Sequence, residues 1–271
     1  MKKFEEELSL IATSRETKGV ESETLKMIDE LLPMLVKEKE WKSVAKLHWE
    51  AHLVWQHTVM NEISKPENER DEKAIKLGAK KMLGFATKAK DVIEEHNFKD
   101  MIGGAYRFLG RAATYAEDHA EAKKYYETAI SKYSGKNLKS KLEVSGFLAD
   151  ALIRLGRPEE GMELAKNTYD DFHKSKIGED LKKEDYFAWA VWMSGIAPRV
   201  CNALIETDSE FDAKEMKKWL KETETVLKSP TGEIKWGDHN FQFRMDEINS
   251  VLSKLVVAVV LSLVLVSPHV F

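Results

Sequence analysis

Apolar residues recur every three or four positions along almost the whole chain, which is the spacing of one face of an α-helix. This pattern predicts helices over roughly these ranges: 22–38, 41–63, 70–96, 98–116, 119–133, 138–155, 158–174, 184–206, 211–228 and a last one that begins near residue 239. A weaker amphipathic segment covers 2–13, and the polar residues 175–183 are predicted to form a connector. The sequence therefore predicts an all-α protein of about 10–11 helices, and its short loops favour antiparallel hairpins.

Residues 103–136 hold a repeat-like arrangement of small and aromatic side chains. An aromatic residue and a Leu-Gly pair on the first helix are followed by Ala, an aromatic residue and Ala on the second, at Tyr106, Leu109, Gly110, Ala122, Tyr126 and Ala129. Small residues at Gly110 and Ala122 would let the two helices approach closely, and the tyrosines would fill the remaining space.

Residues 142–175 repeat the arrangement less fully. The corresponding positions are Leu148, Leu152, Gly156, Pro158, Gly161 and Ala165. Pro158 suits the first position of a helix, because the N–H that proline lacks has no partner there.

Over residues from about 103 to 175, the chain resembles the tetratricopeptide-repeat superfamily. The resemblance implies a right-handed superhelical array of antiparallel helix hairpins that binds a protein or peptide and does not catalyse a reaction. The pair 41–63 and 70–96 is compatible with it, with Ala79, Leu83 and Ala86 lining the second helix, although its loop is too long for a 34-residue period. We expect one helical-repeat domain over 1–250, followed by an apolar tail over 251–271.

The resemblance also implies that the inner helices line a concave groove. Its groove-facing positions hold Arg107, Arg111, Thr114, Tyr115, Asp150 and Arg154. Two arginines one helical turn apart can clamp a carboxylate, which favours an acidic peptide or a C-terminal carboxylate as the ligand. The alternative interpretation is that these arginines are solvated, or pair with acidic neighbours.

Two histidines provide the competing hypothesis, a metal-dependent enzyme. His48 and His52 are four residues apart and share one helix face, but a third ligand is missing, so packing is the better interpretation. The lone Cys201 has an apolar context, which favours a buried and inert thiol. No phosphate-binding loop, dinucleotide turn or nucleophile elbow occurs. We therefore expect no cofactor, no resident metal and no catalytic residue.

The charge and cysteine content of the chain indicate which kinds of partner and which cellular location to expect. The chain has 42 basic and 46 acidic residues and no long basic block, which argues against a nucleic-acid partner. One cysteine permits no internal disulfide, and an acidic run follows the first two lysines where a secretory signal would be apolar. A cytoplasmic location is expected.

The C-terminal tail departs from this composition. Between Leu255 and Val266 only Ser262 is polar. As a helix these residues would span about 18 Å, against about 30 Å for the hydrocarbon core of a bilayer. Four interpretations stay open: a membrane anchor that makes the protein a membrane-associated adaptor, a buried helix, a self-association element, or a non-native extension.

Overall fold

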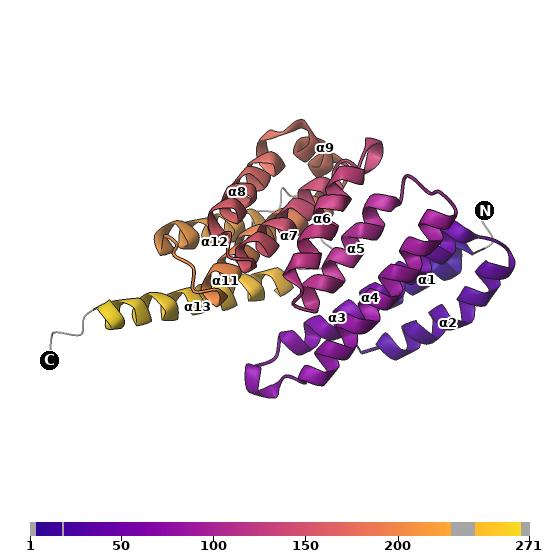
Figure 1. The fold of residues 1–271 in the computed structure, drawn as a ribbon, viewed down its shortest axis with the longest axis horizontal. Helices are drawn as coiled ribbons and strands as arrows, with labels where there is room; N and C mark the ends of the chain where they lie inside the picture. The colour runs from indigo at the N-terminus through magenta and orange to yellow at the C-terminus, as the bar shows by residue number, and fades with distance from the viewer. Residues whose placement is uncertain (1–3, 18, 229–241, 267–271) are drawn as a thin grey trace. The chain divides into compact units, whose positions relative to one another are not determined.

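The structure is a computed structural model that describes residues 4–17, 19–228 and 242–266. Over these residues the chain is helical and contains no strand, which confirms the all-α prediction (Figure 1). It divides into two compact units, unit 1 over residues 1–135 and unit 2 over residues 136–271. The single domain over 1–250 stays a prediction.

Unit 1 consists of successive helices that pack as antiparallel hairpins. They are α1 Glu5–Arg15, α2 Glu21–Lys37, α3 Trp41–Ile63, the short 3-10 helix η1 Glu67–Glu69, α4 Glu72–Glu95, α5 Ile102–Tyr115 and α6 His119–Lys132. The Asp71 side chain accepts hydrogen bonds from the N–H groups of Lys73 and Ala74 and so begins α4. Leu35, Leu47 and Val54 are fully buried in a core shared by α2 and α3.

The hairpin of α5 and α6 has the predicted close contact. A Cβ atom on Gly110 would lie 2.4 Å from Cε1 of Tyr126, whose ring is fully buried. Ala122 and Ala129 are buried beside it, and the Asp118 carboxylate accepts from the N–H of Glu121 to begin α6. The close packing predicted for the first repeat is therefore present in the structure.

Unit 2 contains α7 Ser140–Arg154, α8 Pro158–Lys174, α9 Lys176–Glu184, α10 Tyr186–Ser194, α11 Ile196–Glu206, α12 Ala213–Lys228 and α13 Gln242–Val266. A second 3-10 helix, η2 Gly135–Asn137, precedes α7. The core of unit 2 is built around the buried side chains of Phe172, Trp189, Met193 and Ile248.

The second predicted hairpin is also present. Gly156 adopts a positive φ of 75° in the turn, and Pro158 is the first residue of α8. A Cβ atom on Gly161 would lie 2.7 Å from the carbonyl oxygen of Ala149, so this position of α8 accepts only glycine without a shift. The close helix contact that the sequence predicts at small residues is therefore present in both hairpins.

Residues 175–206 contain more helices than the sequence predicted, because α9, α10 and α11 replace one connector and one helix. The segment predicted as a connector forms α9, because the hydroxyl of Ser175 accepts from the N–H of Gly178 and begins a helix there. The single helix predicted over 184–206 is divided at Gly195, which separates α10 from α11. The side chain of Asp185 begins α10 by accepting a hydrogen bond from the N–H of Ala188.

The first residues of the C-terminal tail belong to unit 2. Val251 and Leu255 on α13 are buried in its core, whereas Val256 and Val257 are 56% and 58% exposed. Residues 267–271 lie outside the described residues. Among the helices that the structure describes, none is both long and apolar enough to cross a membrane.

Candidate functional site

The four predicted groove residues of unit 1 lie along the last two and a half turns of α5, and all four are half-buried. The guanidinium of Arg107 lies 5.1 Å from the centre of the Phe108 ring, in a cation–π contact that helps to hold it. Arg111 follows one turn later on the same face. The helix therefore places both arginines on one face, one turn apart; a ligand-binding groove there stays a prediction.

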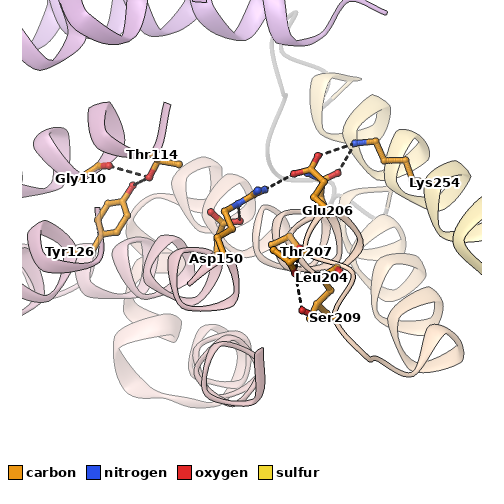
Figure 2. Close-up of polar contacts among 12 residues, drawn as sticks. Gly110, Thr114, Tyr126, Asp150, Leu204, Glu206, Thr207, Ser209 and Lys254 are labelled. Atoms are coloured by element: carbon orange, nitrogen blue, oxygen red, sulfur yellow. Dashed lines mark hydrogen bonds and ion pairs between the residues drawn. The ribbon is translucent and has the colours of Figure 1, made fainter. Parts of the chain in front are cut away.

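Thr114 is engaged in the hairpin itself. Its hydroxyl donates to the carbonyl oxygen of Gly110 at 3.1 Å and lies 2.8 Å from the hydroxyl of Tyr126 (Figure 2). Since the threonine proton is used toward Gly110, the Tyr126 hydroxyl is the donor in the second bond. Thr114 thus ties α5 to α6, and a role in ligand binding stays a prediction for it.

His48 and His52 pack inside unit 1. His52 is fully buried, its ring meets Phe108 edge-on at 4.8 Å, and its Nδ1 donates to the carbonyl oxygen of Met82 at 3.0 Å. His48 packs against Phe85 at 6.1 Å. Among the described residues, no three His, Cys, Asp or Glu side chains gather as a metal ion would require. The packing interpretation accounts for both rings.

Burial first, and nearby positive charge second, lower the pKa of both histidines. Burial lowers the pKa of His52 to about 3; the bond to Met82 opposes that change, and the charges of Arg111 and Arg107 lower the pKa further. Burial, together with the charge of Lys88, lowers the pKa of His48 to about 4. His52 is therefore neutral near pH 7, and the arginines of α5 make its surroundings positive.

A pH effect on stability follows. Between its folded pKa of about 3 and an unfolded pKa of about 6.5, His52 binds a proton only in the unfolded chain. Its contribution to stability is therefore complete above pH 6.5 and is lost as the pH falls, at about 1.4 kcal/mol per pH unit. We expect His52→Gln to flatten the dependence of the unfolding free energy on pH between about 6.5 and 5. Urea unfolding at several pH values measures this, and a slope equal to that of the wild type would contradict the assignment.

Asp150 and Arg154 form an ionic network within unit 2. The Arg154 guanidinium contacts the Asp150 carboxylate at 3.0 Å and Glu206 of α11 at 2.9 Å. Lys254 of α13 contacts Glu206 at 3.4 Å, so the chain of charges joins α7, α11 and α13 (Figure 2). Burial alone would lower the pKa of Arg154, but the two carboxylates outweigh it and leave that pKa raised. The network links three helices, and a ligand-binding role for Asp150 and Arg154 stays a prediction.

Cys201 is buried on α11, and burial raises the pKa of its thiol to about 12. A thiolate is the reactive form of cysteine, so this side chain is unsuited to nucleophilic chemistry. The inert thiol predicted from its apolar context agrees with this environment.

Two features were not predicted from the sequence: a close contact between α3 and α4, and the ion-pair partners of Arg154 in unit 2. A Cβ atom on Gly78 of α4 would lie 2.3 Å from Cγ2 of Val59, so α3 and α4 also pack closely at a glycine. A glycine beside Ala79 in an otherwise helical segment was the available signal. Glu206 and Lys254 could not be paired with Arg154 from the sequence, because they are distant along the chain.

Comparison with solved structures shows a shared fold. The chain is similar to a crystal structure of a single-substitution variant described as "Podosopora anserina putative kinesin light chain nearly identical TPR-like repeats". The TM-score is 0.53 at 11% sequence identity, and the match covers 83% of this chain and 94% of the other. No family model and no curated protein matches the sequence. The chain thus has a tetratricopeptide-like, all-α repeat fold.

Proposed function

We propose that the protein is a non-catalytic scaffold that binds an acidic segment of a partner protein at the face of α5 carrying Arg107, Arg111 and Tyr115. The fold supports this proposal in general terms, because stacked helix pairs present extended surfaces to partners. The single observation that carries it is the arginine pair on α5, whose positive potential also lowers the pKa of the neighbouring His52.

The chemistry of the pair favours a carboxylate ligand. Each guanidinium offers a planar fork of N–H donors that can make two parallel hydrogen bonds to a carboxylate. Arg107 and Arg111 are half-buried, so part of the entropy of their long side chains is already lost before a ligand arrives. Tyr115, half-buried on the following turn, adds a rigid ring with a polar tip beside them.

Peptide selection followed by affinity measurement tests the proposal. A random peptide library displayed on phage would be selected on the full-length protein, and the enriched peptides are expected to be rich in Asp or Glu. For one such peptide, Arg107→Gln with Arg111→Gln should weaken binding by about a hundredfold or more, since charge-assisted hydrogen bonds contribute about 1.5–3 kcal/mol each and every 1.4 kcal/mol is about a factor of ten. Fluorescence polarisation measures the dissociation constants.

A matched variant on the same hairpin serves as the control. Lys123→Gln with Lys124→Gln removes two positive charges from α6, where both lysines pair with glutamates of their own helix. This variant should bind the peptide as the wild type does. Equal affinity of the arginine variant and the wild type, with its circular dichroism unchanged, would remove the site from α5.

A further inference from the structure

The outer face of α4 concentrates positive charge in a chain that is acidic overall. Every exposed side chain between residues 73 and 88 belongs to a lysine or a leucine, apart from Gly84, which has no side chain. These residues, the α4 face, are Lys73, Lys76, Leu77, Lys80, Lys81, Leu83, Gly84 and Lys88. At 100° per residue they cover an arc of about 160°, so they form one continuous surface along the helix.

The lysines of the α4 face are not neutralised by acidic neighbours. No Asp or Glu occurs between Glu72 and Asp91, although acidic residues outnumber basic ones in the whole chain by 46 to 42. The described residues form ion pairs with Lys90, which contacts Asp91 and Glu94, but with none of the five lysines of the face. Lys81 and Lys88 lie over the rings of Trp55 and Phe85, so their charges are partly held by aromatic contacts.

Apolar groups lie among these charges. Leu77 is 49% exposed and Leu83 is 40% exposed, although Leu83 was predicted to line the hairpin. The prediction was wrong because the buried stripe of α4 runs through Ala79, Met82 and Ala86 and turns Leu83 outward. A Cβ atom on Gly84 would meet no other atom within 4 Å, so the surface between the leucines is open.

We propose that the α4 face binds the surface of an anionic phospholipid bilayer. Clusters of about four to eight basic residues on one helix are typical of surfaces that bind anionic lipids. Each ammonium can reach lipid phosphates on its flexible stem while the leucines enter the headgroup region. Lysine point charges on a convex helix suit a fluid, disordered anionic surface better than the fixed two-point geometry of a peptide carboxylate. This surface lies on a different helix from the arginine pair, and the inference does not rest on the proposed function.

Vesicle binding by the full-length protein tests this inference. We expect co-sedimentation with vesicles of phosphatidylcholine containing about 30% phosphatidylserine, and little with phosphatidylcholine alone. Changing Lys73, Lys76 and Lys80 to glutamine should lower partitioning roughly a hundredfold, since each basic residue near such a surface accounts for about fivefold. Leu77→Ser with Leu83→Ser should also weaken binding while leaving the helical circular dichroism unchanged.

The chain offers a control with the same change of charge. On α12, Lys214, Lys217 and Lys221 are exposed but interspersed with the exposed Glu215 and Glu222. Changing these three lysines to glutamine should leave partitioning nearly unchanged. The inference is overturned if the α12 variant loses as much binding as the α4 variant, or if neither loses any, which would assign binding to the C-terminal tail or another surface. Equally tight binding to soluble polyglutamate would overturn it in favour of an acidic macromolecule.

Discussion

Replacing Trp189 by alanine is expected to lower the free energy of unfolding by about 3–5 kcal/mol. The ring is 1% exposed at the centre of unit 2, and its Nε1–H donates to the carbonyl oxygen of Phe172 at 2.9 Å. It also meets His173 edge-on at 5.5 Å and lies beneath the ammonium of Lys182 at 4.6 Å. Truncation would leave a large cavity and a carbonyl oxygen without its donor.

Urea denaturation of two further variants separates these contributions. Trp189→Phe keeps most of the volume and loses the hydrogen bond, so it should cost about 1–3 kcal/mol. Trp192→Ala, a change at a half-buried tryptophan of the same helix, should cost less than Trp189→Ala. Equal losses for the two alanine variants would contradict the central position of Trp189 in the core.

Adding one methyl group at Gly110 is expected to destabilise the protein by about 1–3 kcal/mol. Replacing glycine by alanine inside a helix normally stabilises it by about 1 kcal/mol. At Gly110 we expect the opposite effect on the free energy of unfolding, because the packing is tight. The cause is the fully buried Tyr126 ring, whose Cε1 and Cδ1 atoms would lie 2.4 Å and 2.5 Å from the new Cβ. Thermal and urea unfolding of Gly110→Ala measure the effect.

A control and a double-mutant cycle tie that loss to the helix contact. Gly84→Ala on the open face of α4 should be neutral or stabilising by up to about 1 kcal/mol, because its Cβ would meet nothing. In a Tyr126→Leu background the cost of Gly110→Ala should shrink, since the opposing ring is gone. Additive costs in the double variant would show that Gly110 and Tyr126 do not face each other as described.

The hairpins could be predicted from the sequence because their signals are local. Gly110, Tyr126, Gly156 and Pro158 each serve a packing or turn requirement that is visible within a helix–turn–helix unit of about 34 residues. Helix α9 was missed because its start depends on one capping hydroxyl, that of Ser175, within a polar segment.

Among the candidate functional residues, too, local features could be predicted from the sequence and tertiary contacts could not. The adjacency of Arg107 and Arg111 follows from helix geometry, and their arrangement on α5 agrees with it. The burial of His52 against Met82 and the link from Arg154 to Glu206 depend on tertiary contacts that no local pattern carries. The α4 face was missed because its lysines are spaced through a helix rather than placed in one basic block.

We propose that Arg107 and Arg111 hold a carboxylate ligand, and their side-chain N–H signals in an NMR spectrum would report on that binding. A nitrogen–proton NMR spectrum of the full-length protein would be recorded with and without a selected acidic peptide, with assignment by the two single Arg→Gln variants. We expect the Nε–H signals of Arg107 and Arg111 to shift in proportion to the peptide bound, while that of Arg154 in unit 2 stays in place. Saturating peptide that leaves both α5 signals unmoved would contradict it.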